Sequence, residues 1–422
     1  MTNEPLFTSR REFLSGGLTL LSAAGTLPIF LGSTMRVMGS DAPAKRKSDS
    51  DPILVVVQMA GGNDGLNTVV PYEMDPYYKL RRTLAIPKND VLRLEDGVGL
   101  HPAATGLKAL FDDGRMAIVQ GVGYPNPNRS HFTGTDIWAS ADPKLRQHSG
   151  WLGRYFDSCC KGDDPAPEPI QGIALVKETP VAMQGEKFMP LAFENPDALT
   201  WQAGRRDRDA ANVFRKLNNI SGDFPKTDSE LGQFLQRAAL KAQVGADEIR
   251  AATGRSIRAS RRGGRLGQSL QLVAKMIAAD MPTRIYYVSM GGFDTHTGQA
   301  GRHRRLMEEF SGGIKEFLDT LTREKLSERV LVMSFSEFGR RVEENASGGT
   351  DHGEAAPMFL FGDKVAAGVH QKHPDLTKLR RGDLQFGTDF RRVYATVLQH
   401  WLNVKSQPIL GGSFLPLRLI KR

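Results

Sequence analysis

Short apolar runs that alternate with amphipathic helical patterns limit how this 422-residue chain can fold more than any other feature. The runs cover residues 53–58, 116–122, 171–176, 284–289, 330–334 and 357–361. Their β-branched and aliphatic residues are typical of strands buried on both faces of a parallel sheet. Helical periodicity recurs in residues 101–112, 210–217, 231–244, 266–279, 301–325 and 388–403. The alternation predicts an α/β fold in which helices sandwich a mostly parallel central sheet.

The chain divides into a processing signal, a linker and one folded domain. Residues 1–44 form the signal, residues 45–52 the linker and residues 53–422 the domain, with a helical region at 197–280 as an inserted or capping layer. In the signal, Arg10 and Arg11 precede a weakly apolar run, and Ala42-Pro43-Ala44 offers a small-residue cleavage site. This segment resembles a twin-arginine (Tat) export signal. A chance basic pair before a signal anchor is the alternative.

The export signal predicts where the protein works. Tat substrates cross the membrane folded, commonly with a metal or cofactor already loaded. We therefore expect the Tat export machinery as one partner, and a periplasmic or secreted location. No later apolar run is long enough to cross a bilayer, so the mature chain is predicted to have no integral membrane span.

Cysteine content and charge argue against two further classes of protein. The only cysteines are the adjacent Cys159 and Cys160, which rules out a disulfide framework because neighbouring cysteines rarely pair without strain. The net charge is +9, and residues 205–265 hold fourteen Lys or Arg against seven Asp or Glu. No aromatic residue interleaves with the arginines from Arg255 to Arg265, so a solvated helical face is favoured over nucleic-acid binding.

Polar residues gather where the predicted strands end. These residues are Asn63, Asp64, Ser130, His131, Asp294, His296, Glu337, Asp351 and His352. Each alone fits an ordinary hydrogen-bonded loop, but several strand ends that offer carboxylates and imidazoles together favour one shared site. Such side chains suit a divalent metal such as Zn, Mn, Mg or Ca, as one ion or two.

Ser130 follows a proline-rich loop and precedes a predicted helix. Its position suits an N-cap, which is a sufficient structural explanation. A helix N-terminus also favours bound anions, because its free amides and dipole face the ligand. Ser130 is therefore either a cap or a nucleophile beside a phosphate or sulfate.

Five segments together resemble the Tat-exported domain-of-unknown-function family 1501. They are Ala60-Gly-Gly-Asn-Asp-Gly-Leu-Asn-Thr-Val-Val-Pro71, Arg129-Ser-His-Phe132, Gly292-Phe-Asp-Thr-His296, Ser336-Glu-Phe-Gly-Arg-Arg341 and Gly349-Thr-Asp-His-Gly353. That family is placed with the alkaline phosphatase and sulfatase superfamily. The resemblance therefore implies an alkaline phosphatase-like domain from residue 53 to the C-terminus.

The resemblance also implies roles for individual residues. Asp64 stands where the first strand's metal-binding aspartate stands, and Ser130 is the candidate nucleophile with Thr133 in reserve. Asp294 and His296 resemble a metal element of the superfamily, although their spacing is two residues rather than four. His352 resembles the histidine that binds metal before a later strand.

One segment departs from the superfamily pattern. Glu337-Phe338-Gly339 stands where phosphatases and sulfatases have Asp-His-Gly, so Glu337 can ligate a metal and Phe338 cannot. Asp351 or His303 would have to replace the lost imidazole. Arg340, with Arg341, can either bind the anionic ester as a catalytic group or form a solvated helix start.

Two functions remain open from the sequence. The first is an exported, metal-dependent hydrolase or transferase of phosphate or sulfate esters, in which Ser130 attacks and Arg340 holds the anion. Its metal ligands would be drawn from Asp64, Asp294, His296, Glu337, Asp351 and His352. The substrate would be an anionic ester, either a small molecule or a polymer. The second is an inactive exported binding or assembly protein on the same fold, which Phe338 favours.

Overall fold

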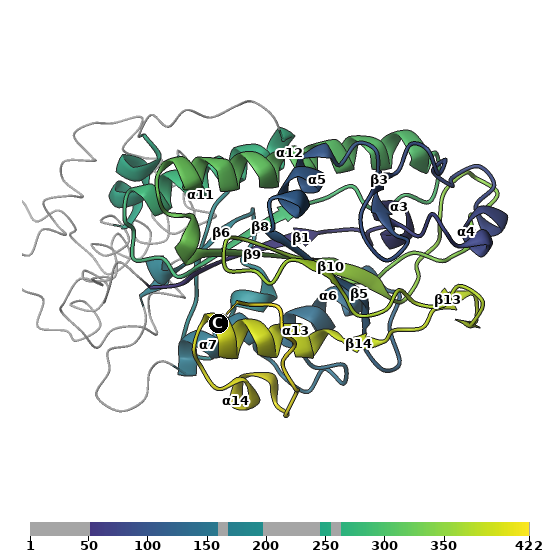
Figure 1. Ribbon diagram of the computed structural model, residues 1–422. Coiled ribbons are helices and arrows are strands. Elements are labelled where there is room, and N and C mark those ends of the chain that lie inside the picture. The colour runs from purple at the N-terminus through teal and green to yellow at the C-terminus, as the bar shows by residue number, and fades with distance from the viewer. Residues whose placement is uncertain (1–50, 159–167, 197–244, 255–262, 422) are drawn as a thin grey trace, which may run out of the picture.

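A nine-stranded, mostly parallel sheet forms the centre of the protein, shown in the computed structural model of Figure 1. The structure describes residues 51–158, 168–196, 245–254 and 263–421. The predicted export signal and most of the predicted linker lie outside these residues, as do Cys159, Cys160 and most of the helical region 197–280. The predicted α/β architecture is confirmed.

The strands of the large sheet come from all parts of the described chain. They are β1 (Ile53–Met59), β5 (Met116–Gly123), β6 (Gly172–Leu175), β7 (Leu191–Ala192), β8 (Ile285–Met290), β9 (Val330–Phe335), β10 (Ala356–Phe361), β11 (Gly368–His370) and β14 (Thr388–Asp389). Their order is β11-β5-β10-β9-β1-β8-β6-β7, with β14 also paired to β5. The residues of β1 and β9 are buried throughout, as expected for central strands covered on both faces.

Only β10 runs against the other strands of this sheet. It pairs antiparallel with both β5 and β9, whereas the other pairings are parallel. Residues 336–355, which connect β9 to β10, contain no helix, so the chain leaves β9 and enters β10 at the same edge of the sheet. The loops after β1, β5 and β8 and the connection from β9 to β10 therefore meet at one edge of the sheet.

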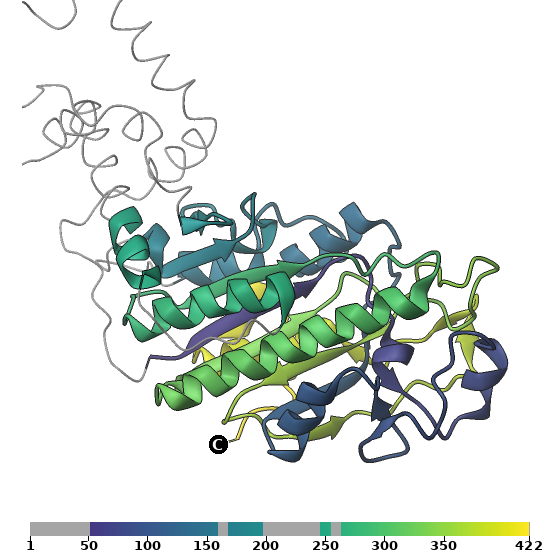
Figure 2. The ribbon, with the colours of Figure 1, turned by 90° about the horizontal axis from the view of Figure 1, so that it is seen from above.

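Two helical layers cover the faces of the sheet, as Figures 1 and 2 show. One layer comprises α5 (Thr105–Asp112), α11 (Gly264–Ala278) and α12 (Gln299–Arg323). The other comprises α6 (His131–Ser140), α7 (Trp151–Ser158), α13 (Phe390–Thr396) and α14 (Ser406–Leu410). Each layer packs into its own hydrophobic core. The helix predicted for residues 388–403 is α13 continued by a π-helical turn, Val397–Trp401.

Smaller elements extend the edge where the loops meet. A short helix, α3 (Gly65–Thr68), follows β1, and α4 (Asp75–Leu80) comes next. The strands β2 (Val69–Val70), β3 (Leu92–Arg93) and β4 (Gly99–Leu100) form a small sheet, and β12 (Leu379–Arg380) pairs with β13 (Asp383–Leu384). Among the described residues, no helix has the length and apolarity needed to cross a membrane.

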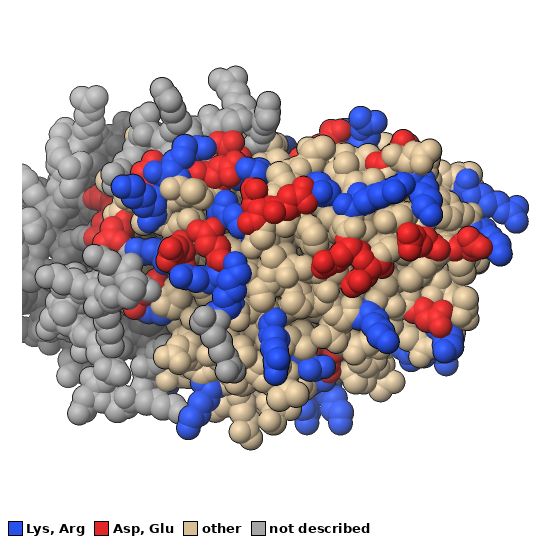
Figure 3. All heavy atoms as spheres, in the orientation of Figure 1, with Lys and Arg blue, Asp and Glu red and all other residues tan. Residues whose placement is uncertain are grey.

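Charged side chains of both signs share the surface in view in Figure 3. Blue and red groups alternate over the described part of this face and do not form one continuous basic patch. Most of the arginines from Arg255 to Arg265 lie outside the described residues. The prediction that this segment does not bind nucleic acid therefore stays a prediction.

Phe310→Ala should destabilise the protein by about 3–5 kcal/mol, because it leaves a cavity in the core. Phe310 is fully buried on α12, and its ring lies 6.1 Å from those of Phe359 and Phe361 on β10. Urea unfolding measures the change. The matched control, Phe132→Ala, removes a side chain that is 85% exposed and should change stability by less than about 0.5 kcal/mol. Equal stability losses for the two variants would contradict this packing.

Candidate metal centre

His131 enters the site from the first residue of α6 and is fixed by a buried carboxylate. Its Nδ1 lies 2.9 Å from Oε1 of Glu337, which is 2% exposed and also accepts from the backbone N–H of Gly61. The other ring nitrogen, Nε2, lies 3.5 Å from Oδ2 of Asp294. Glu337 thus turns Nε2 of His131 toward Asp294 and does not itself reach the centre of the site.

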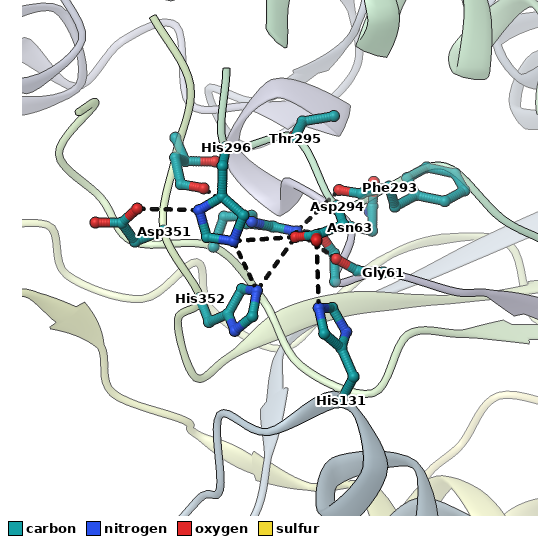
Figure 4. Close-up of polar contacts among 12 residues, drawn as sticks. Gly61, Asn63, His131, Phe293, Asp294, Thr295, His296, Asp351 and His352 are labelled. Atoms are coloured by element: carbon teal, nitrogen blue, oxygen red, sulfur yellow. Dashed lines mark hydrogen bonds and ion pairs between the residues drawn. The ribbon is translucent and has the colours of Figure 1, made fainter. Parts of the chain in front are cut away.

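His296 and His352 approach the same carboxylate from two other loops. Nε2 of His296 lies 3.1 Å from Oδ1 of Asp294, and Nε2 of His352 lies 3.2 Å from the same oxygen. Nδ1 of His296 contacts Asp351 at 3.1 Å, and Nδ1 of His352 donates to the carbonyl of Arg129 at 2.8 Å. In Figure 4 the rings of His131, His296 and His352 all point toward Asp294.

The Nδ1 atoms of the three histidines all face groups away from the centre. Those of His131 and His296 face Glu337 and Asp351, and that of His352 donates to the carbonyl of Arg129. Each Nε2 faces Asp294, and it presents a lone pair to a cation when it carries no proton. Nε2 of His296 and Nε2 of His352 are only 2.9 Å apart. At this distance one nitrogen can donate a hydrogen bond to the other, or, when neither carries a proton, a cation bound to both relieves the repulsion between their lone pairs. The geometry therefore suits a metal ion held by imidazole nitrogens and Asp294.

Arg340 keeps the carboxyl group of Asp294 ionised, which is the form that could bind a metal ion. Burial raises the pKa of the Asp294 carboxyl, but hydrogen bonds from Arg340 and His352 and the charge of Arg340 outweigh burial and bring the pKa to about 2. Within the described residues, His131, Asp294 and His352 form the group in which one ligand atom from each lies within 4.8 Å of the others. His296 stands beside them as the fourth candidate ligand.

Arg340 is a structural residue rather than an anion-binding one, contrary to the expectation from the sequence. Its side chain is fully buried. Nη2 donates to Oδ1 of Asp294 at 2.7 Å and to the carbonyls of Phe293 and Gly61, while Nε donates to Gly62 at 2.8 Å. With these bonds made, the guanidinium is not exposed to an incoming ester. Arg340 positions Asp294 instead.

The glycine turn after β1 allows its backbone to lie close to the backbone of the loop that follows β8. A Cβ on Gly61 would lie 2.4 Å from the backbone nitrogen of Asp294, and one on Gly62 would lie 2.2 Å from the ring of Phe338. Both residues also have positive φ, +120° and +79°. The close approach expected from the sequence is thus made to protein groups rather than to a ligand. Phe338 is buried and packs against the rings of His131 and His352.

Asp64 does not join the histidines. It is 1% exposed, and its Oδ2 pairs with Nη1 of Arg81 at 2.5 Å and accepts from Gln299. Its Oδ1 caps α3 by accepting from the N–H of Leu66. Burial raises the pKa of Asp64, but the charge and hydrogen bond of Arg81 outweigh burial, so the pKa is lowered. These partners occupy both oxygens, so the metal role implied by resemblance is not supported by the geometry.

Ser130 occupies the predicted N-cap position of α6, but its side chain makes no cap hydrogen bond. The residue is exposed, and its two neighbours both contribute to the metal centre. The carbonyl of Arg129 fixes His352, and the ring of His131 faces Asp294. Ser130 thus has an available hydroxyl next to the candidate ligands.

The structure brings together Asp294, His296 and His352 from the residues singled out in the sequence as ligands. Glu337 contacts His131 and Asp351 contacts His296, so these two carboxylates orient the imidazole rings rather than face the centre of the site. The sequence interpretation noted His131 at a strand end but did not assign it as a ligand. Its position directly after Ser130, at the start of the helix that follows β5, was the signal that could have identified it.

The sequence matches the family model described as "Protein of unknown function (DUF1501)" over residues 116–410. The match covers more than half of the chain, and the chain therefore belongs to the DUF1501 family. No curated protein matches the sequence.

Several solved structures are similar to this fold at low sequence identity. The PsFucS1 sulfatase from Pseudoalteromonas sp. has a TM-score of 0.36 and 10% identity, over 94% of this chain and 72% of that one. A protein in the alkaline phosphatase superfamily from Vibrio parahaemolyticus has a TM-score of 0.36 and 7% identity, over 92% and 76%. The lipoteichoic acid synthase LtaP from Listeria monocytogenes has a TM-score of 0.33 and 8% identity, over 91% and 80%. Similarity this distant carries no weight for the function of the site.

Asp64→Asn should lower the free energy of unfolding by about 3–5 kcal/mol at neutral pH, because it leaves the buried Arg81 without its counter-charge. Since the pKa of Asp64 is lowered by folding, the pairing contributes fully above the ordinary value of 3.8 and is lost as the pH falls below it. Urea unfolding at several pH values should therefore show the difference between wild type and variant shrinking in acid. Equal stability at neutral pH would contradict the structural role.

Proposed function

We propose that this protein is an exported, metal-dependent hydrolase or transferase that acts on phosphate or sulfate esters. The observation that carries the proposal is the convergence of three imidazole Nε2 atoms on Asp294, with the exposed Ser130 next in sequence to His131. Metal ligands beside an unengaged hydroxyl at a helix N-terminus are what displacement at phosphorus or sulfur requires. Export through the Tat pathway rests on residues 1–44 and is part of the same proposal.

The ligand set favours Zn²⁺ over the other ions considered. Imidazole nitrogens suit zinc and later transition metals, whereas Mg²⁺ and Ca²⁺ prefer oxygen ligands. Asp294 supplies one oxygen, and His131, His296 and His352 supply nitrogens. Because all four side chains point to one place, we infer a single ion. A divalent ion held there would polarise the ester oxygens and lower the pKa of a nearby hydroxyl.

The chain's own groups would bind and attack the ester. The free amides at the start of α6 and the helix dipole favour an anionic group in front of Ser130. Oγ of Ser130 gives up its proton and bonds to phosphorus or sulfur as the ester bond breaks, and the leaving oxygen takes up one proton to become an alcohol, so no net proton is gained or lost. Water or an acceptor alcohol then releases the phosphate or sulfate from Ser130. Glu337 and Asp351 keep the rings of His131 and His296 oriented throughout.

Zinc content should separate ligands from neighbouring residues. Wild type, loaded and then dialysed, should retain about one zinc ion per chain, whereas His352→Ala should retain almost none. Glu337→Gln should weaken zinc binding by about 10–100-fold, because it loosens the orientation of His131. Mass spectrometry of the metal and a competitive chelator titration measure these values.

The control for this experiment is His400→Ala, which removes an exposed imidazole on the π-helical turn after α13. It should bind zinc like wild type. Equal zinc retention by His352→Ala and His400→Ala would refute the metal centre.

Ser130→Ala should abolish turnover of p-nitrophenyl phosphate and p-nitrophenyl sulfate, by at least about a thousandfold in kcat, while leaving zinc content unchanged. Ser413→Ala, which alters an exposed serine near the C-terminus, serves as the matched control and should keep wild-type turnover. Full activity in Ser130→Ala would show that another group attacks. A zinc-loaded wild type that turns over no ester would favour the exported binding protein instead.

A further inference from the structure

A cluster of four arginines lies beside the metal centre and is only half neutralised. Arg129 forms ion pairs with Asp383 and, at 3.6 Å, with Glu354. Arg380 donates to Glu354 at 2.7 Å, and Nε of Arg341 lies 3.8 Å from Asp383.

Arg381 completes the cluster at the tip of the β12–β13 hairpin. With φ of +55° at Arg381 and +86° at Gly382, the tight turn holds this residue at the surface. Its side chain is exposed and forms no ion pair with a described carboxylate, while its carbonyl accepts from Nη2 of Arg341 at 3.2 Å. The cluster thus sets four guanidinium groups against two carboxylates.

The four charges act on one another. Arg129 and Arg341 share Asp383, and Arg129 and Arg380 share Glu354, so these three positive charges lie close together and repel one another. Glu354 and Asp383 are buried, whereas the side chains of Arg341 and Arg380 are 38% and 44% exposed. The buried carboxylates therefore hold the arginines on the inner side of the cluster, and the excess positive charge of the cluster faces solvent.

Sequence neighbours and backbone hydrogen bonds place this cluster at the edge of the metal centre. Arg129 precedes Ser130, and its carbonyl accepts from Nδ1 of His352. Glu354 lies two residues after His352, and the backbone N–H of Arg341 donates to the carbonyl of Asp351 at 2.9 Å. The arginines therefore adjoin, along the chain and through backbone hydrogen bonds, the residues proposed to bind the ester.

We propose that Arg129, Arg341, Arg380 and Arg381 form a subsite for a second anionic group, so that the substrate is an ester carrying several sulfates or phosphates. Guanidinium groups bind such oxygens bidentately, and two of the four charges are left without a carboxylate of their own. The inference rests on the proposed function, since it extends the site around Ser130.

Binding of labelled dextran sulfate and of labelled polyphosphate, measured by fluorescence anisotropy, tests the subsite without requiring turnover. Uncharged dextran is the blank, and the two polyanions distinguish sulfate from phosphate. Arg381→Gln should weaken the preferred polyanion about three- to tenfold, and Arg341→Gln combined with Arg381→Gln by more than about tenfold. Turnover of p-nitrophenyl esters, which carry one anionic group, should stay within about twofold for Arg381→Gln.

The matched control is Arg418→Gln, which removes an exposed arginine at the opposite end of the sheet. Arg418 precedes Leu419, whose carbonyl binds the N–H of Ala366, beyond the end of β10 that lies away from the site. Wild-type affinity in Arg381→Gln, equal loss in Arg418→Gln, or no polyanion binding by wild type would each overturn the subsite. If the subsite variants selectively lose polyanion binding while wild type shows no esterase activity, the subsite would be upheld and the proposed reaction refuted.

Discussion

The buried guanidinium of Arg340 joins the loops that form the candidate metal centre. It follows β9, and it donates to carbonyls in the loops after β1 and β8 and in the loop before β10, where Nη1 reaches Thr350 at 2.8 Å. Among the residues that the structure describes, its one carboxylate partner is Asp294. A buried charge left without its partner costs several kcal/mol, so these bonds are made together. Arg340 therefore fixes the position of Asp294, and Asp294 fixes where three imidazoles can meet.

The reversed strand β10 is the second constraint on the site. If β10 ran parallel to β9, a crossover would carry His352 to the opposite edge of the sheet. Because residues 336–355 return directly, Glu337 and His352 lie on the same edge as His131 and Asp294. The site thus depends on one antiparallel strand within an otherwise parallel sheet.

Much of the fold could be predicted from the sequence, because buried strands and amphipathic helices leave local patterns. The run at 53–58 became β1, and that at 116–122 became β5. The site was harder to predict, since a carboxylate's role depends on which distant partner reaches it. Nothing local shows that Asp64 pairs with Arg81 or that Arg340 is enclosed by backbone carbonyls. The candidate ligands Asp294 and His296 were recognisable because parallel strands bring their ends to one edge. His352 reaches the same edge because β10 runs antiparallel to β9.

The most direct test of the central claim is X-ray absorption at the zinc edge of the zinc-loaded protein. Three histidines and one aspartate predict a first shell dominated by nitrogen and oxygen at about 2.0–2.1 Å, with outer-shell scattering from three imidazole rings. Loss of one imidazole contribution in His296→Ala, with the others retained, would confirm its place as the fourth ligand. A first shell of oxygen alone, or zinc bound without imidazole scattering, would contradict the centre described around Asp294.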